Sequence, residues 1–255
     1  MPFVTANGVE LHVQRQPRPG APVVVLVHGL ADSLASFYFT LTGPLAEAGF
    51  DVISYDLRGH GRSERPPTGY TLLNSGEDLA ALLDALGVDR PVHLVGYSLG
   101  TTIAISFAHR HPGRVADIAM IEGEPPTKAW ANRMTDALAR ADAVINDAAF
   151  MAEQDEVAHK AAARGRELAA HTTAMTDSLD PSGLLSPDQV RAVTHPKLLI
   201  LGEQSDLALV RAELEDLLTT CETRVIPGQT HLLLADAPLQ VRALLVPWLT
   251  ERSMR

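Results

Sequence analysis

PVHLVGYSLGTTIAISFAHR, residues 91–110, carries a Gly-x-Ser-x-Gly pentapeptide centred on Ser98. The apolar run before it is typical of a buried strand, and the segment after it has helical spacing. In a strand-to-helix turn of this kind, glycines let the strand and the helix approach closely, while the serine takes a strained backbone conformation that exposes its hydroxyl. The pentapeptide alone also fits an ordinary glycine-rich turn, but the flanking strand and helix favour a nucleophile. We therefore expect Ser98 to be a catalytic nucleophile.

Apolar runs without strict alternation recur on both sides of this turn, which indicates strands of a parallel sheet covered on both faces. The expected strands are residues 22–27, 51–55, 91–95, 115–121, 197–201 and 223–226. An Asn-Gly pair between residues 2–5 and 9–13 predicts a β-hairpin that starts the fold. Helical spacing occupies residues 36–48, 72–86, 99–109, 207–218 and 235–250. This alternation predicts a right-handed, doubly wound α/β fold.

Residues 125–194 break the alternation, because they contain no strand-like run and are rich in Ala, Glu, Arg and Met. An insertion of this length in a compact domain is usually a lid or a binding element. We expect three or four helices that form a cap between the sixth and seventh strands. The core would then comprise residues 1–124 and 195–255, and the whole chain would be one structural domain.

Charge and composition exclude several classes of partner. The 255 residues carry a formal charge of -10, from 31 acidic and 21 basic residues, which disfavours binding to nucleic acids and to anionic membranes. Cys221 is the only cysteine in the sequence and cannot form an internal disulfide. No signal-peptide pattern and no apolar stretch of roughly 18 residues is present. We expect a cytoplasmic protein with a bacterial type of composition, a small-molecule substrate and an oligomeric state that the sequence leaves open.

Four further motifs follow the expected strands: HGL (residues 28–30), DLRGHGRS (56–63), GEQSD (202–206) and GQTH (228–231). Together with the pentapeptide at Ser98, they make the sequence resemble the α/β-hydrolase superfamily over nearly its whole length. The resemblance implies a mostly parallel, eight-stranded sheet with helices on both faces and a helical cap between strands 6 and 7. It implies no metal and no organic cofactor, and the sequence has no phosphate-binding G-K-[ST] loop and no H-E-x-x-H motif.

The resemblance also implies a catalytic triad. A serine hydroxyl is a weak nucleophile, so it needs a general base and a carboxylate that holds this base in the correct tautomer. His231, after the last strand, matches the base of the family, and Asp206, after the seventh strand, matches the acid. Other carboxylates near the ends of strands remain alternatives for the acid: Glu203, Glu122 and Glu124.

The oxyanion hole and the substrate pocket follow from the same resemblance. The backbone N–H groups of Leu30 and Leu99 would stabilise the negative charge that develops on the substrate oxygen. His28 is expected to fix the oxyanion loop and not to react. The expected substrate contacts lie beside these groups or in the cap, namely Phe37, Tyr38, Tyr97, Trp130 and Met134, with Phe150, Met151 and Met175 as further cap candidates.

The implied function is a cofactor-independent serine hydrolase of a small to medium apolar ester, lactone or thioester, which acts through an acyl-enzyme on Ser98. Epoxide hydrolases and haloalkane dehalogenases are disfavoured, because they require aspartate at the position of Ser98. Carbon–carbon bond hydrolases usually show a glycine-rich oxyanion loop, whereas residues 28–32 read HGLAD. A lyase or cyclase that uses the triad, and a non-catalytic ligand receptor, remain the alternatives.

Overall fold

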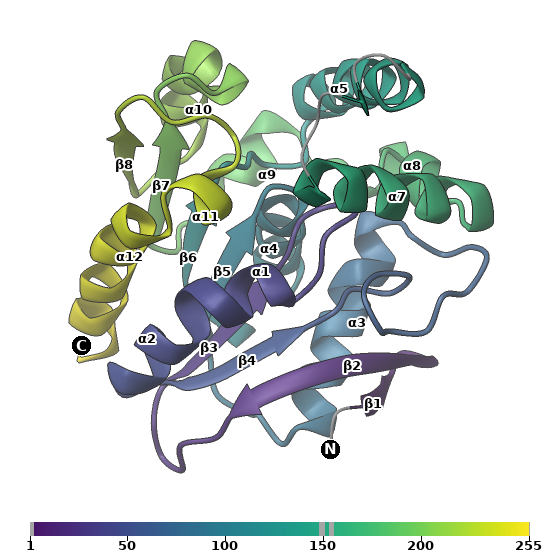
Figure 1. Cartoon of the computed structure of the whole chain (residues 1–255). Coiled ribbons are helices and arrows are strands. Elements are labelled where there is room, and N and C mark those ends of the chain that lie inside the picture. Colours follow the sequence, from purple (N-terminus) through teal and green to yellow (C-terminus); the bar gives the residue numbers. More distant parts are fainter. Residues whose placement is uncertain (1–2, 148–150, 153–155, 255) are drawn as a thin grey trace.

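The computed structural model describes residues 3–254 except 148–150 and 153–155, and its centre is a single twisted sheet (Figure 1). The order of the strands in this described part of the chain is β1-β2-β4-β3-β5-β6-β7-β8. The strands are β1 (Phe3–Ala6), β2 (Val9–Gln16), β3 (Val23–Val27), β4 (Asp51–Tyr55), β5 (Val92–Tyr97), β6 (Val115–Ile121), β7 (Lys197–Gly202) and β8 (Cys221–Ile226). The predicted mostly parallel, eight-stranded α/β-hydrolase sheet is confirmed.

Pairing within the sheet follows the pattern of the sequence. The hairpin of β1 and β2 turns at Asn7 and Gly8, both of which have positive φ angles, as an Asn-Gly hairpin turn requires. Strand β2 pairs antiparallel with β4, and every pairing from β4 to β8 is parallel. The carboxyl ends of β3 to β8 therefore meet at one edge, where ligands of open α/β sheets bind.

The helices are α1 (Ala35–Phe37), the π-helical η1 (Tyr38–Thr42), α2 (Gly43–Glu47), α3 (Leu72–Ala85), α4 (Leu99–Arg110), η2 (Pro112–Arg114), α5 (Lys128–Asn146), α7 (Glu156–His171), α8 (Ala174–Asp177), η3 (Pro181–Gly183), α9 (Pro187–Arg191), η4 (Asp206–Val210), α10 (Arg211–Leu217), α11 (Leu233–Asp236) and α12 (Pro238–Ser253). Three expected helices are broken into shorter pieces. Residues 36–48 pass through a π-helical turn, and residues 207–218 begin with a 3₁₀ turn. The third, residues 235–250, is interrupted at Ala237, whose φ of -134° is not helical.

Two apolar layers cover the sheet. Strand β3 is buried along its whole length, and its side chains alternate between the layers, with Val25 in one and Val24 and Leu26 in the other. Helices α3 and α4 pack in the first layer, whereas η1, α2 and α12 pack in the second. Burial on both faces is the reason that these strands read as unbroken apolar runs.

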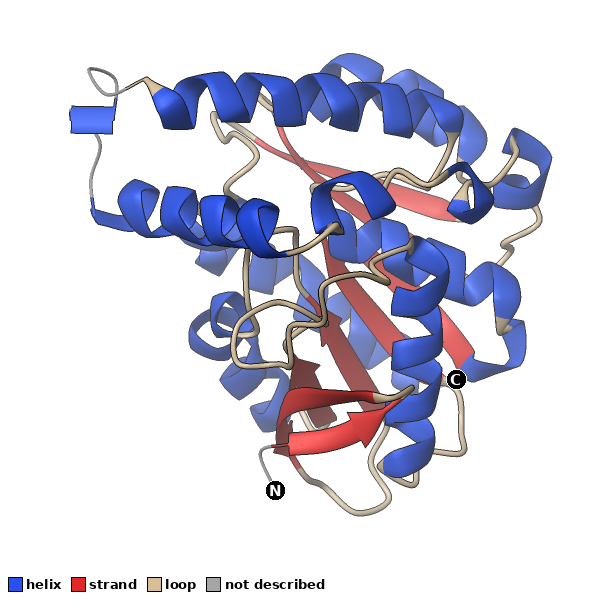
Figure 2. Ribbon diagram, turned by 90° about the vertical axis from the view of Figure 1, so that its right-hand side faces the viewer, coloured by secondary structure: helices blue, strands red, loops and turns tan. Residues whose placement is uncertain are grey.

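Helices between β6 and β7 lie over the edge at which the parallel strands end, as both views show (Figures 1 and 2). Contacts tie α7 to the core: Arg164 donates a hydrogen bond to the carbonyl of Ala31 at 3.0 Å, and Glu167 pairs with Arg65. Residues 125–194 thus contain the helices expected of a cap, and their role as a cap remains a prediction. None of the described helices is both long enough and apolar enough to cross a membrane.

The loop after β4 is braced by buried polar groups. The Asp56 carboxylate accepts hydrogen bonds from the backbone N–H groups of Leu34 (2.8 Å) and Arg62 (2.9 Å). Arg58 pairs with the buried Asp78 at 2.6 Å. Within this loop, burial lowers the pKa of His60 to about 3. The imidazole of His60 is therefore neutral in the folded protein at neutral and mildly acidic pH.

His60 should make the stability of the protein depend on pH. An unfolded histidine titrates near 6.5, so between pH 6.5 and about 3 the unfolded chain binds a proton at His60 that the folded chain does not. The free energy of unfolding should therefore fall by about 1.4 kcal/mol per pH unit from this residue as the pH drops through that window. Urea unfolding at several pH values should show that the free energy of unfolding depends less steeply on pH in His60→Gln than in the wild-type protein. Equal slopes in the two proteins would contradict the prediction.

Candidate active site

The turn at Ser98 has the geometry of a nucleophile elbow. Ser98 lies between β5 and α4 with φ 51° and ψ -119°, a backbone conformation that non-glycine residues rarely adopt. A Cβ atom at Gly100 would collide with the backbone of Val27, and one at Gly96 would come within 2.5 Å of the backbone of Thr101. Only glycine fits at these two positions, because strand, helix and neighbouring strand approach so closely there.

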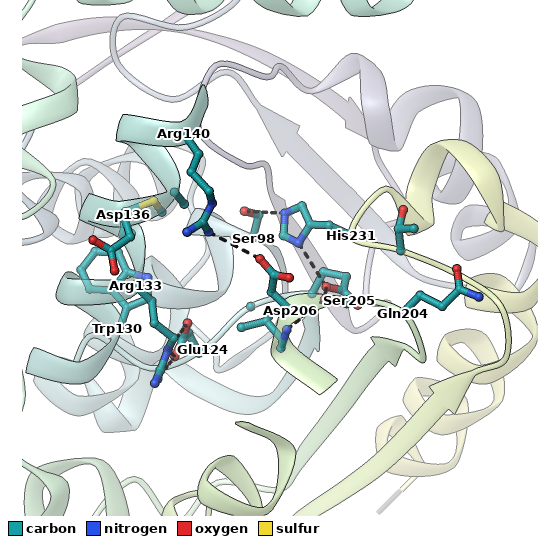
Figure 3. Close-up of a pocket in the computed structure, with 16 residues that line it drawn as sticks. Ser98, Glu124, Trp130, Arg133, Asp136, Arg140, Gln204, Ser205, Asp206 and His231 are labelled. Carbon is teal, nitrogen blue, oxygen red and sulfur yellow. Dashed lines mark hydrogen bonds and ion pairs between the residues drawn. The ribbon is translucent and has the colours of Figure 1, made fainter. Parts of the chain in front are cut away.

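His231 faces Ser98 from the loop after β8. Its Nε2 atom lies 3.2 Å from the Ser98 Oγ atom, which is hydrogen-bond distance (Figure 3). The Tyr97 ring stacks on the imidazole with the ring centroids 5.7 Å apart, and its hydroxyl donates to the His231 carbonyl at 3.0 Å. Burial raises the pKa of Tyr97, so its hydroxyl stays protonated as the donor. Tyr97 therefore holds the His231 segment, whereas the sequence suggested a substrate contact.

Glu122 is the carboxylate that the structure places against His231. It follows β6 directly, and its Oε2 atom lies 3.1 Å from the His231 Nδ1 atom. The carboxylate is fully buried and accepts further hydrogen bonds from the backbone N–H of Gly202 and from the Ser205 hydroxyl. Glu122 has a positive φ of 49°, as Ser98 does. Backbone strain of this kind is often retained at functional sites.

The structure does not bring Asp206 to His231, in contrast to the expectation from the resemblance. The side chain of Asp206 is 87% exposed, and its carboxylate faces Arg140 at 3.5 Å. The physical reason lies in the start of η4, where Ser205 is the N-cap with a buried side chain and Asp206, as the next residue, turns outward. Figure 3 shows Asp206 and Arg140 pointing toward each other beside the nucleophile.

The other two carboxylates that the sequence left open have different partners. Glu203 accepts a hydrogen bond from the backbone N–H of Gly228 at 2.8 Å. Glu124 is buried and forms an ion pair with Arg133 of α5. Of the four candidates for the acid, the structure brings only Glu122 into contact with the histidine. The sequence signal for Glu122 was its place at the end of a strand, which also held for its competitors.

The expected oxyanion loop lies against the elbow. An added Cβ atom at Gly29 would come within 3.2 Å of the Ser98 Cβ atom. Leu99 is the first residue of α4, so its backbone N–H has no acceptor within the helix. Leu30 is the next residue after Gly29. The role of the Leu30 and Leu99 backbone N–H groups as an oxyanion hole remains a prediction.

His28 holds this loop in place. Its Nε2 atom accepts a hydrogen bond from the backbone N–H of Leu57 at 2.9 Å, and its Nδ1 atom lies 2.7 Å from the Gly29 carbonyl. Nδ1 must then carry the proton that it donates to this carbonyl. Burial lowers the pKa of His28, which favours the same neutral form. These contacts agree with a structural role for His28.

A cavity of about 430 Å³ opens beside Ser98 and His231. Its walls come from the elbow, the ends of β6 and β7, the His231 loop and α5 (Figure 3). The apolar part of the wall consists of Trp130, Met134, Ala137 and Leu207. Trp130 and Met134 were expected to contact substrate, and both line the cavity. Among the described residues, no group of three or more His, Cys, Asp or Glu side chains could hold a metal ion.

The other expected contacts lie outside the lining of this cavity. Phe37 is fully buried in the apolar layer under η1, and Tyr38 is 45% exposed on that helix. Their closeness to the oxyanion loop in the sequence does not bring either side chain into the cavity, because Phe37 points into the apolar layer and Tyr38 toward solvent. Met151 and Met175 of the cap are also absent from the lining, and Phe150 lies outside the described residues.

Both arginines in the cavity wall already have acidic partners. Arg133 pairs with Glu124 and lies 3.5 Å from Glu213, and Arg140 pairs with Asp206. The cavity therefore offers an apolar wall, and its lining carries more acidic side chains than arginines. This arrangement suits an uncharged ligand better than an anion.

Comparisons with known proteins give a consistent result. A sequence model of a family described as "alpha/beta hydrolase fold" matches residues 22–172. The chain is 36% identical over 140 residues to epoxide hydrolase A of Mycobacterium tuberculosis, in an alignment that spans 51% of this chain and 43% of that protein. It is 31% identical over 229 residues to the protein named "Putative carbamate hydrolase RutD" of Variovorax paradoxus, which covers 86% of this chain and 84% of that one.

Solved structures share the fold. A carboxylesterase structure from the thaumarchaeon Nitrososphaera gargenis superimposes with a TM-score of 0.81 at 22% identity, and the match covers 99% of both chains. The family match extends from the start of β3 to the end of α7 and takes in the elbow at Ser98. With the sheet order and the elbow geometry described above, these similarities show that the chain belongs to the α/β-hydrolase-fold family.

Proposed function

We propose that the protein is a serine hydrolase that cleaves small to medium, uncharged apolar esters, lactones or thioesters through an acyl-enzyme on Ser98. The observation that carries this proposal is the hydrogen-bonded line from Ser98 Oγ to His231 Nε2 (3.2 Å) and from His231 Nδ1 to Glu122 Oε2 (3.1 Å). A nucleophile, a base and a carboxylate that orients the base are the components of a catalytic triad. Glu122 takes the role that the sequence suggested for Asp206.

The triad would act in two stages. The Ser98 Oγ atom attacks the carbonyl carbon while His231 Nε2 accepts the hydroxyl proton, and this proton then passes to the departing oxygen or sulfur atom as its bond to carbon breaks. Water subsequently attacks the acyl-enzyme, His231 accepts a proton from it, and Ser98 recovers that proton as the acid product leaves. Backbone N–H groups of Leu30 and Leu99 would bind the oxyanion in both stages.

The nature of the cavity supports an uncharged substrate. Trp130, Met134 and Leu207 provide an apolar surface beside the nucleophile, and Arg133 and Arg140 are already paired with carboxylates. A substrate carboxylate would approach a lining that holds two arginines and four acidic side chains, namely Glu122, Glu124, Asp136 and Asp206. Epoxide hydrolysis is not part of the proposal although one relative carries that name, because the residue at the elbow is serine and not aspartate.

The proposal predicts turnover of neutral acyl esters with a detectable acyl-enzyme. Matched p-nitrophenyl esters of pentanoate and of glutarate, which differ by a terminal carboxylate, should differ by about tenfold or more in kcat/KM in favour of the neutral ester. Rapid acid quench and peptide mass spectrometry should find the pentanoyl group on Ser98.

The same experiment separates the alternatives. A lyase or cyclase would form an adduct on Ser98 without releasing the free acid, and a receptor would return every ligand unchanged. Turnover of the panel without acylation of Ser98 would contradict the proposed mechanism. A preference for the glutarate ester would contradict the proposed substrate class alone.

A further inference from the structure

Ser205 makes a contact that the triad itself does not include. Its hydroxyl lies 2.6 Å from Glu122 Oε2, and this same oxygen faces His231 Nδ1. The other carboxylate oxygen, Oε1, accepts the backbone N–H of Gly202. Ser205 is 5% exposed, and Glu122 has no exposed side-chain surface. Protein donors thus replace water around a buried carboxylate.

The direction of this hydrogen bond is fixed by the second contact of the hydroxyl. The Ser205 Oγ atom accepts the backbone N–H of Leu207 at 3.2 Å, as the N-cap of η4. A hydroxyl has a single proton to donate, and Glu122 is the acceptor within reach of it. Ser205 therefore donates to Glu122 while the η4 backbone holds its oxygen in position.

The hydrogen bond from Ser205 to the Glu122 carboxylate can help to orient His231. A hydrogen bond to a charged group is stronger than one between neutral groups, so losing this donor costs more than losing a donor to a neutral acceptor. Without the Ser205 hydroxyl, Oε2 would keep His231 as its only side-chain donor among the described contacts, and the carboxylate could rotate away from the plane of the imidazole. The histidine would then spend less time in the tautomer and orientation that can accept the Ser98 proton.

We propose that Ser205 is a positioning residue of the catalytic triad, which acts on His231 through the Glu122 carboxylate. This inference rests on the hydrolase function proposed above. Two neighbouring residues of the loop after β7 then have different roles. Ser205 turns inward and holds the Glu122 carboxylate, whereas Asp206 turns outward to Arg140. The family resemblance had assigned catalytic importance in this loop to Asp206.

The test compares side chains that differ in the hydroxyl. Ser205→Ala should lower kcat for the neutral ester by about 10- to 100-fold with KM changed less than about threefold, because the residue orients the base and does not hold substrate. Ser205→Thr keeps the hydroxyl and should recover most of this loss. Ser205→Val has nearly the shape of threonine without the hydroxyl, so it should resemble Ser205→Ala.

A second serine provides the matched control for folding. Ser186 caps α9 in the same way, with its hydroxyl accepting the backbone N–H of Gln189, but it lies outside the cavity lining. Ser186→Ala should lower the melting temperature through loss of a cap and leave kcat within about twofold of wild type. The low-field proton NMR signal of His231 Nδ1–H should move or broaden in Ser205→Ala and remain in place in Ser186→Ala.

The possible outcomes separate the two proposals. If the wild-type protein hydrolyses the esters and Ser205→Ala matches it in kcat and in the His231 proton signal, the positioning role is wrong and the hydrolase proposal stands. Equal losses in Ser205→Thr and Ser205→Val would also overturn the inference, because the hydroxyl would then be irrelevant. A wild-type protein that hydrolyses no ester and forms no adduct on Ser98 would overturn the function on which the inference rests.

Discussion

Ser98→Ala is expected to lower ester hydrolysis by at least about 10⁴-fold, because among the described contacts Ser98 is the only hydroxyl within hydrogen-bond distance of the His231 ring. The Ser98 hydroxyl is the donor that faces His231 Nε2, and the positive φ of Ser98 already positions it at the tip of the elbow. Removing one oxygen atom leaves the backbone turn intact. A serine-directed phosphonate should therefore label the wild-type protein at Ser98 and fail to label the variant.

Ser106 serves as the control, since it lies two turns further along α4 and its buried hydroxyl has no partner among the described contacts. Ser106→Ala removes an unsatisfied polar group, so it should keep activity and stability close to wild type. Labelling of a serine other than Ser98, or turnover by Ser98→Ala at the rate of wild type, would show that the nucleophile is elsewhere. Circular dichroism would establish that both variants keep the fold.

The elbow and the sheet could be predicted because each depends on local sequence. The strand before Ser98 and the helix after it are contiguous with the pentapeptide, so one stretch of sequence shows both the motif and the elements that flank it. The apolar runs at residues 51–55 and 115–121 coincide with β4 and β6 to the residue. A strand that is buried on both faces leaves little freedom in composition, which makes its limits visible in the sequence.

The partner of His231 could not be decided in the same way, because it depends on which side chains turn inward. Ser205 and Asp206 are neighbours at the start of η4, yet their side chains point in opposite directions. The Ser205 hydroxyl contacts the buried Glu122 carboxylate, whereas the Asp206 side chain lies in solvent. Glu122 reaches His231 because β6 lies between the nucleophile strand and β7 in the sheet. Strand order is a tertiary property that the position of Glu122 in the sequence does not display.

The pocket was only partly predictable for a related reason. Trp130 and Met134 lie four residues apart on α5, so helical spacing puts them on one face, and both line the cavity. Phe37 and Tyr38 were expected in the pocket because they lie near the oxyanion loop in the sequence. Sequence proximity does not show which way a side chain points, and the structure buries Phe37 in the apolar layer.

Glu122→Gln is expected to reduce kcat by about 10⁴-fold, the loss seen when the acid of a serine protease triad is replaced by its amide. The change keeps the size of the side chain and adds no new strain at the positive φ of residue 122. It replaces an acceptor by a group that can turn its NH₂ toward His231 Nδ1. That nitrogen would then have to be the acceptor, the proton would move to Nε2, and Nε2 could no longer accept the proton of Ser98.

Asp206→Asn is the discriminating comparison, because the resemblance and the structure disagree about that residue. A carboxylate that is 87% exposed and 3.5 Å from an exposed arginine contributes little, so Asp206→Asn should change kcat by less than about tenfold. Glu203→Gln should behave similarly, since its carboxylate is bonded to the Gly228 N–H and not to the histidine. The opposite result would be a kcat that falls about 10⁴-fold in Asp206→Asn and stays near wild type in Glu122→Gln. In that case the loop after β7 must rearrange during turnover to bring Asp206 to His231. Ser205 would then have to leave Glu122, because it shares the start of η4 with Asp206, so this pair of variants tests the geometry of the whole loop.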